Sequence, residues 1–180
     1  IAFQAEQTAI GEFTQLKSRY QALEQPLTQV SQLDEQVQNT LTAISQKSDL
    51  TSLQTDITAL QTNLQKLDAY LTQFNENEQG LTQHWTQVQA AADKADSDRA
   101  DQTKAEAETL VEKTAQKKQQ LTQLSERLQA SKTLAGKMQQ ALSGVSAIET
   151  LESRHTELNN QANTTLEALT KTHLHTDGGD

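Results

Sequence analysis

The chain has 180 residues, of which 34% are hydrophobic and 3% aromatic, and its net charge is −9. This apolar content is thin for a compact globular core, and 6 glycines with 1 proline are too few for the many tight turns of a β-sandwich or barrel. The acidic charge argues against binding to nucleic acid or to anionic membrane surfaces, and the absence of cysteine excludes disulfides, thiol catalysis and cysteine-based zinc sites.

The first predicted helix covers residues 5–46. Its apolar residues follow one another mostly at steps of three and four: Phe13, Leu16, Tyr20, Leu23, Leu27, Val30, Val37, Leu41 and Ile44. Pro26 interrupts this helix, because proline removes a backbone hydrogen bond and clashes with the preceding turn. We expect a kink at Pro26, near Glu24–Gln25, rather than two separate helices, since the register continues across the proline.

A helix–helix turn is predicted at Ser48–Asp49. The apolar register slips by two residues between Ile44 and Leu50. Serine and aspartate are also favoured N-cap residues for a helix that begins at Leu50. An unbroken helix with a coiled-coil discontinuity is the competing interpretation.

The second predicted helix, residues 50–76, carries the longest regular apolar stripe in the chain. This stripe continues beyond the helix and consists of Leu50, Leu53, Ile57, Leu60, Leu64, Leu67, Leu71, Phe74, Leu81, Trp85 and Val88. Steps of three and four average about 3.5 residues, the repeat that holds a narrow seam of one helix against a partner helix. The segment Asn75–Gly80 favours a helix end, whereas the register favours continuity, so a hairpin turn and a continuous helix both stay open.

The third predicted helix covers residues 81–142. Its residues 89–109 lack large apolar side chains but keep a high helix propensity through alanine. Because alanine weakens a helical seam, we expect this stretch to be flexible or to lack a partner. An apolar stripe returns at Leu121, Leu124, Leu128, Ala135, Met138, Leu142 and Val145.

A further helix boundary is predicted at Gly144. Ser146 and Glu149 have the spacing of a capping box, in which each side chain accepts a hydrogen bond from the other residue's backbone N–H. A last helix is therefore predicted at residues 147–173, followed by a polar tail at 174–180. Its apolar stripe consists of Ile148, Leu151, His155, Leu158, Ala162 and Leu169.

Two groups of polar residues resemble metal sites. His173 and His175 face different ways on a helix and have no third ligand nearby in sequence, so a polar terminus is favoured. Four acidic residues have the density of a calcium loop: Asp93, Asp96, Asp98 and Asp101. Counted from Asp96, the sixth and twelfth residues are Asp and Ala instead of Gly and Glu, which favours a solvated helix face.

The remaining candidates also have structural interpretations. Trp85, beside His84, occupies a core position, so packing is favoured over a recognition hot spot. Asp34 and His155 occupy core positions too, where a polar residue can fix register or helix number. Asn163-Thr164-Thr165 matches the N-glycosylation pattern, which arises easily by chance. No phosphate loop or catalytic constellation is present, so we expect no enzyme and assign no catalytic residue, cofactor or metal ligand.

The heptads at residues 53–64, with the sequence LQTDITALQTNL, are rich in Gln and Thr. Together with the acidic, cysteine-free composition, they resemble the extracellular coiled-coil stalks of Gram-positive membrane proteins of the EsaA-like (type VII secretion accessory) and phage-infection-protein-like families. The resemblance lies in style over most of the chain, and no functional residue is carried over. It implies a surface-exposed stalk in a dimeric membrane complex. Bacterial spectrin-like division proteins and phage structural proteins share the helical style.

The sequence thus predicts an all-α, elongated rod of about three to five long helices, folded as antiparallel coiled coil or helical hairpins. We expect a single region over residues 1–180, cut from a larger chain. The expected role is a structural stalk or spacer in a bacterial cell-surface or membrane-anchored protein, in a secretion-associated complex.

The expected location is extracellular, on a Gram-positive bacterium. The expected partners are proteins or a second copy in a homodimer, with no nucleic acid, and the membrane is reached only through other parts of the larger chain. The alternatives are a protein-binding module, including a phage receptor, and a cytoplasmic spectrin-like scaffold or division protein.

Overall fold

A computed structural model describes the backbone of residues 1–178 and the side chains of residues 1–172. Over this range the protein is all-α and contains no β-strand, which confirms the predicted fold class at that level. The chain divides into two compact units: Ile1–Gly136, called unit 1, and Lys137–Asp180, called unit 2.

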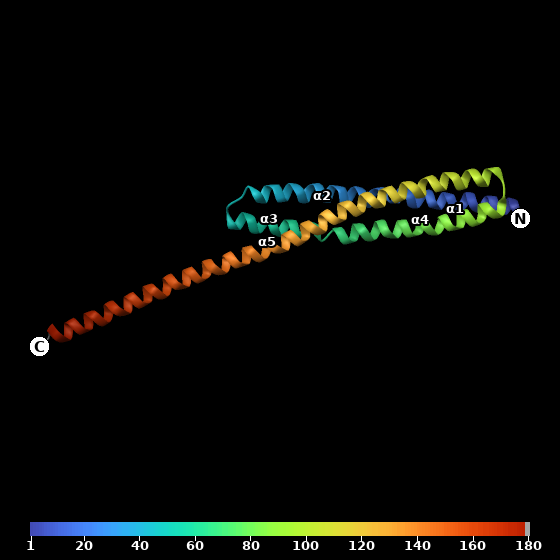
Figure 1. Cartoon of the computed structure of the whole chain (residues 1–180). Helices are drawn as coiled ribbons and strands as arrows, with labels where there is room; N and C mark the ends of the chain where they lie inside the picture. Colours follow the sequence, from blue (N-terminus) through green and yellow to red (C-terminus); the bar gives the residue numbers. More distant parts are fainter. Residues whose placement is uncertain (179–180) are drawn as a thin grey trace. The chain divides into compact units, whose positions relative to one another are not determined.

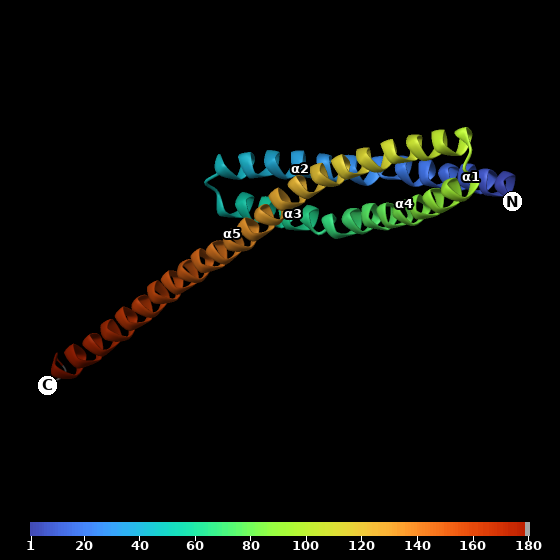
Figure 2. The same ribbon diagram turned by 45° about the vertical axis from the view of Figure 1, so that its right-hand side comes forward.

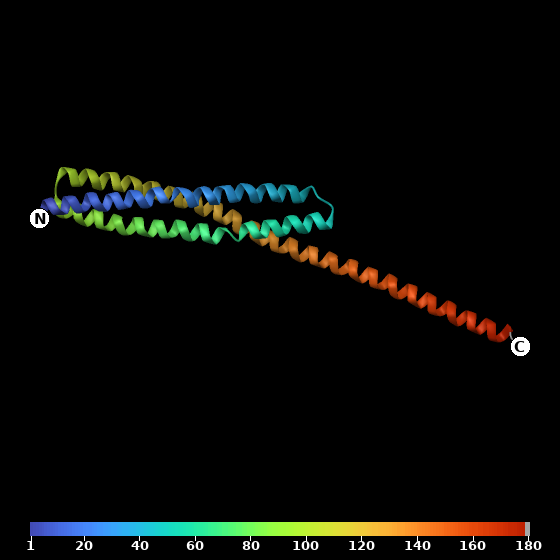
Figure 3. The same ribbon diagram turned by 180° about the vertical axis from the view of Figure 1, so that it is seen from behind.

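Unit 1 is built from four helices and the first part of a fifth. They are α1 (Ala2–Ala22), α2 (Glu24–Ser45), α3 (Leu50–Leu64), α4 (Leu67–Ala95) and the residues of α5 (Asp98–Gly178) up to Gly136. In Figure 1, α2 continues the direction of α1, and α3 and α4 return beside them in the opposite direction. The first part of α5, drawn in yellow, reverses the direction again, and the turned views in Figures 2 and 3 agree with this order.

The turn between α2 and α3 confirms the predicted helix–helix connection at Ser48–Asp49. Asp49 has an extended backbone, and its side chain accepts a hydrogen bond from the backbone N–H of Ser52 at 2.9 Å. This is the N-cap interaction that the sequence predicts, because it satisfies one of the free N–H groups of the first helical turn. The competing unbroken helix is therefore wrong.

Pro26 disturbs the helix as predicted, but the single kinked helix predicted over residues 5–46 is wrong, because two helices meet at Leu23. Helix α1 ends at Ala22, Leu23 is a single turn residue, and α2 begins at Glu24. Proline has no N–H for the carbonyl four residues before it, and its ring crowds that carbonyl. The backbone adapts locally: the N–H of Leu23 donates to the Tyr20 carbonyl at 3.1 Å, and the N–H of Leu27 already donates to the Leu23 carbonyl at 3.3 Å.

No helix boundary occurs at Gly80, so the hairpin turn and the predicted helix limits at residues 76 and 81 are wrong. Helix α4 runs through Gly80, and the boundary lies instead at Gln65–Lys66. Both residues keep right-handed helical dihedral angles, and the N–H of Lys66 donates to the Asn63 carbonyl at 3.1 Å. This tightened turn carries no Gly or Pro, so the sequence offers no signal for it.

The uninterrupted helix predicted over residues 81–142 is also wrong, because the chain reverses at Asp96–Ser97. Asp96 has φ of 46° and ψ of 53°, a left-handed conformation that aspartate tolerates better than most residues. The Ser97 hydroxyl accepts from the N–H of Ala100 at 3.2 Å and donates to the Glu6 carboxylate at 3.0 Å. One side chain thus caps α5 and ties the turn to α1.

The boundary predicted at Gly144 is absent. Helix α5 continues through Gly144, and no helix begins at Ser146, so the predicted limits at 142 and 147 are wrong. An added Cβ at Gly144 would meet no atom within 4 Å, and a glycine inside a helix lowers its stability without ending it. The backbone of the predicted tail is helical to Gly178, while residues 179–180 lie outside the described residues.

The core of unit 1 is a narrow file of apolar side chains. Among its fully buried members are Leu16, Leu23, Val30, Val37, Leu60, Leu67, Phe74, Leu81, Val88, Leu121 and Leu128. Most of the predicted stripe of residues 50–88 is therefore buried, although Leu50, Leu53, Leu71 and Trp85 are only half-buried. The narrowness of this core explains how a chain with so few apolar residues still folds.

The alanine-rich stretch has a packing partner, so of the two predicted alternatives, flexibility or a missing partner, the second is wrong. Ala92 and Ala95 of α4 form a buried cluster with Ala5 and Ala9 of α1 and with Ala100 of α5. Methyl side chains let three helical backbones approach closely at this end of unit 1. Local sequence patterns do not predict this contact, because α1 and α4 are far apart in the sequence.

Candidate interaction surfaces

Asp34, which was predicted at a core position, is buried in unit 1. Its Oδ1 atom lies 3.4 Å from Nε of Arg127 on α5 and makes no hydrogen bond with favourable geometry. The contact is therefore an attraction between opposite charges. It joins α2 to α5, while the role of Asp34 in fixing the register of its helix stays a prediction.

His84 and Glu12 form a polar contact that sequence reasoning missed. Nδ1 of His84 lies 2.5 Å from Oε2 of Glu12, and the two residues are 72 positions apart in α4 and α1. Both side chains are about a quarter exposed, at 26% and 29%. Trp85 beside them is half-buried, so it packs against unit 1 and also reaches its surface.

Two adjacent lysines of α5 connect this helix to α2 and to α4. Lys117 Nζ donates to the Glu24 carboxylate on α2 at 2.7 Å. Lys118 Nζ donates to Oδ1 of Asn75 at 2.6 Å and lies 3.5 Å from Glu78, both on α4. The hydrogen bond and the positive charge of Lys117 hold the pKa of the Glu24 carboxyl below its ordinary value. These contacts orient α5 within unit 1.

The acidic group and His155 are exposed, so the predicted core position of His155 is wrong within the described part of the chain. The four aspartates at 93, 96, 98 and 101 lie on the surface around the α4–α5 turn, and Asp93 pairs with Lys104 at 3.1 Å. Asn163 is exposed on α5. Among the described residues, no group of three or more His, Asp or Glu is arranged to hold a metal ion. The side chains of His173 and His175 lie outside the described residues.

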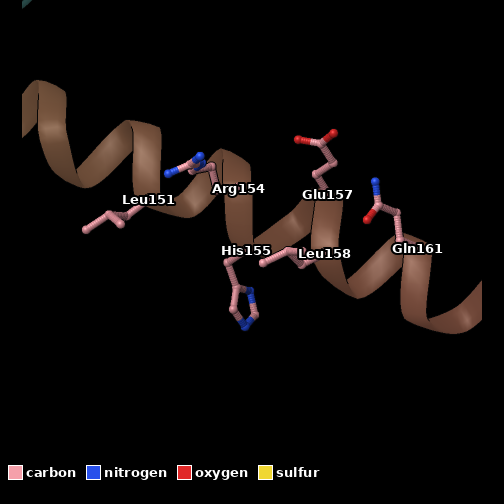
Figure 4. A pocket seen from close by; sticks show the side chains of 6 residues that line it. All are labelled: Leu151, Arg154, His155, Glu157, Leu158 and Gln161. Carbon is pink, nitrogen blue, oxygen red and sulfur yellow. The ribbon is translucent and has the colours of Figure 1, made fainter.

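A shallow hollow is present on α5 of unit 2. Its lining comes from successive turns of this one helix: Leu151, Arg154, His155, Glu157, Leu158 and Gln161. Figure 4 shows Leu151, His155 and Leu158 on one side of the helix, and Arg154, Glu157 and Gln161 on the other. The hollow is therefore the open surface of a helix with one apolar side.

This apolar side extends into a longer surface, here called the 148–169 stripe. It consists of Ile148, Leu151, His155, Leu158, Ala162, Leu166 and Leu169, which at about 100° per residue fall within roughly 80° of the helix circumference. The Ile and Leu side chains of the stripe are between 57% and 65% exposed. The heptad pattern missed Leu166, because the strict 3.5-residue repeat drifts away from the 3.6 residues per turn of a straight helix.

No family model, no curated protein and no solved structure matches this chain. Among the described residues, no helix combines the length and the apolar character that crossing a bilayer requires.

Proposed function

We propose that this chain is a non-enzymatic stalk or spacer, an elongated antiparallel coiled-coil rod that holds other parts of a larger assembly apart. The observation that carries the proposal is the construction of unit 1. Its α1 and α2 contribute 21 and 22 residues in succession, which at about 1.5 Å per residue span roughly 65 Å. The narrow core described above supports this length, since it stabilises paired helices along their axes without building a broad interior.

The proposed setting is the surface of a Gram-positive bacterium, in a membrane-anchored, secretion-associated complex. The Gln- and Thr-rich, acidic, cysteine-free heptads support this setting through their resemblance to EsaA-like and phage-infection-protein-like stalks. The many Gln and Thr residues also suit a spacer, because uncharged polar side chains stay solvated without attracting charged ligands.

The second candidate function is a protein-binding module, with a phage receptor as one form of it. The exposed 148–169 stripe and the half-buried Trp85 favour this candidate, because aromatic and large apolar side chains dominate binding energy at interfaces. A cytoplasmic spectrin-like scaffold has the same helical architecture. It differs from the cell-surface proposal in location, which labelling of intact cells would decide.

Small-angle X-ray scattering of the full chain, recorded together with its mass, tests the rod. A compact protein of this length has a radius of gyration of about 16 Å. The rod requires a value well above this. A value near that of a compact protein would contradict the proposed shape and remove the physical basis for a spacer.

A replacement experiment separates the spacer from the binding module. In the protein that carries this chain, residues 1–136 are exchanged for an unrelated helical hairpin bundle of equal length, and a second variant is shortened by paired heptads. A spacer keeps its activity in the exchanged variant and loses it in the shortened one. A binding module that uses Trp85 loses its activity in the exchanged variant. Trp85→Ala also abolishes its binding in a protein that stays folded.

A further inference from the structure

The described side chains of residues 143–172 are all exposed, although this segment is helical and carries a continuous apolar side. Large apolar groups that recur along one helix face and remain in water mark an interaction site. The 148–169 stripe is therefore the strongest candidate surface in the described chain for a partner.

The composition of this segment makes a partner necessary for its stability. Residues 143–172 contain three asparagines, one glycine and several serines and threonines, all of which have lower helix propensity than alanine or leucine. A helix without tertiary contacts is marginal in water, and most helical stability in proteins comes from packing of an amphipathic face. Covering the stripe supplies the packing that this segment otherwise lacks.

We propose that the occupant of the 148–169 stripe is the same stripe of a second copy of this chain, which pairs with it as a two-stranded coiled coil. Covering a Leu or Ile side chain removes on the order of 100 Å² of apolar surface from water. The stripe carries one Ile and four Leu residues. Pairing of two copies therefore buries roughly 1,000 Å² from these side chains alone. This comes close to the roughly 1,200 Å² at which stable specific interfaces begin, before the flanking residues are counted.

Charge also favours a second copy at this segment. The whole chain has a net charge of −9, so two copies repel each other over most of their length. Residues 137–172 carry only three basic residues, Lys137, Arg154 and Lys171, against four glutamates. This nearly neutral region is where two acidic chains approach with little electrostatic opposition.

The pairing names a partner for the proposed stalk but does not depend on the spacer role. If the chain dimerises but fails the replacement experiment, the proposed interface stands and the proposed spacer role is rejected. If the chain is monomeric but passes the replacement experiment, the proposed spacer role stands and the proposed interface is rejected.

Sedimentation equilibrium of the full chain tests the proposal directly. The expected mass at high micromolar concentration is twice the 19.9 kDa of one chain, with dissociation on dilution and a parallel loss of helical circular dichroism. A mass of one chain at all concentrations overturns the proposal, whether the stripe stays exposed or is covered within its own chain.

Two matched variants separate pairing from helix propensity. The double variant Leu151→Ala with Leu158→Ala removes apolar surface from the stripe and introduces a strong helix former. We expect the dissociation constant of the dimer to rise at least 100-fold, on the order expected for loss of packed leucines. The control is Ser153→Ala with Asn160→Ala, which makes the same change to alanine on the opposite side of the helix. Equal effects of the two double variants would overturn the assignment to the stripe.

Cysteine cross-linking locates the contact, because the chain contains no cysteine of its own. Under mild oxidation, Leu151→Cys cross-links to itself if the helices are parallel and in register. A mixture of Leu151→Cys and Leu169→Cys chains cross-links preferentially between the two variants if the helices are antiparallel. Ser153→Cys, on the opposite side, is the control. Efficient cross-linking of the control alone would contradict pairing through the stripe.

Discussion

Helix α5 carries apolar residues at helical spacing in both units, but their surroundings differ. In unit 1, Leu121 and Leu128 are 1% and 0% exposed, whereas in unit 2, Leu151 and Leu158 are 64% and 65% exposed. The spacing of apolar residues thus identifies the face of a helix that is stabilised by packing against another segment. Whether the same chain supplies that partner depends on the turns, which the spacing does not encode.

The comparison also separates side-chain size from packing. Within unit 1, α5 buries small residues at many contact positions, including Ala100, Thr103, Ala107 and Thr114. The Thr103 and Thr114 hydroxyls bond to carbonyls of their own helix, at 2.9 Å and 2.8 Å, so their burial leaves no hydroxyl without a partner. A weakly apolar stretch can therefore pack well, while a strongly apolar stretch remains exposed.

The largest difference between the units should appear on truncation of Phe74, which is fully buried in unit 1. We expect Phe74→Ala to lower the free energy of unfolding of unit 1 by about 3–5 kcal/mol. Trp85 is the only tryptophan of the chain and lies in unit 1, so its fluorescence during denaturant unfolding reports on this unit. The matched change in unit 2, Leu158→Ala, should leave the same transition within about 0.5 kcal/mol. A comparable loss would show that the two units unfold together.

Enlarging the alanine cluster should produce the next largest effect. Ala9 of α1 is 0% exposed and packs in a cluster with alanines of α4 and α5. A leucine side chain has no room at this position. We expect Ala9→Leu to destabilise unit 1 by about 1–3 kcal/mol, measured by the same fluorescence transition. The control is Ala105→Leu on the exposed face of α5. If the variants at the two positions are equally stable, the close approach of helices at this end is incorrect.

Two glycines of unit 1 offer a smaller test. An added Cβ at Gly11 meets no atom within 4 Å, whereas at Gly80 it would lie 2.8 Å from Nε of Arg19. We expect Gly11→Ala to stabilise unit 1 by about 0.5–1 kcal/mol through helix propensity. At Gly80 that gain should be largely offset, since Arg19 must move and loses its 3.3 Å hydrogen bond to Asn77. Equal stabilisation by both substitutions would mean that Arg19 does not pack over α4.

Acid should weaken unit 1 slightly through two carboxyl groups. Lys117 lowers the pKa of Glu24, and hydrogen bonds from Ser52 lower the pKa of Asp49. A carboxyl with a lowered folded-state pKa stabilises the protein above its unfolded-state pKa, and this contribution disappears as the pH falls through the folded-state pKa. Both groups are exposed, so the effect is small.

The pH experiment compares denaturant midpoints near neutrality and in acid. Glu24→Gln and Asp49→Ala should each lower the denaturant midpoint near neutrality. They should also reduce the difference between the midpoints measured near neutrality and in acid. Glu35→Gln, at an exposed position of α2, is the control. An identical acid response in all four proteins would contradict the assigned contributions.

The helical class and most core positions of α1 to α4 could be predicted, because Leu, Ile, Val and Phe at steps of three and four report their own burial. The Asp49 cap was also predictable, because aspartate directly before the start of a predicted helix is a favoured N-cap residue. The tight turn at Gln65–Lys66 was not, since neither residue disfavours a helix. The reversal at Asp96–Ser97 was missed because a left-handed aspartate leaves little trace in sequence.

The candidate surfaces divide in the same way. The 148–169 stripe could be predicted as a face, but its exposure in unit 2 could not, because burial depends on which segments meet. The contacts of Glu12 with His84 and of Lys117 with Glu24 join residues far apart in the chain. Their pairing follows from where the reversals fall.

The two-residue link Asp96–Ser97 restricts how unit 1 can change in length. Adding one residue to a helix rotates every following side chain by about 100°, whereas adding seven nearly restores the original direction. Since the link is too short to absorb a rotation, an insertion in α4 must be matched in α1 and in α5 to keep their faces together. Homologous bundles of this kind should therefore differ in length by shared steps of about seven residues, which gives sequence alignments of such bundles a rule for placing gaps.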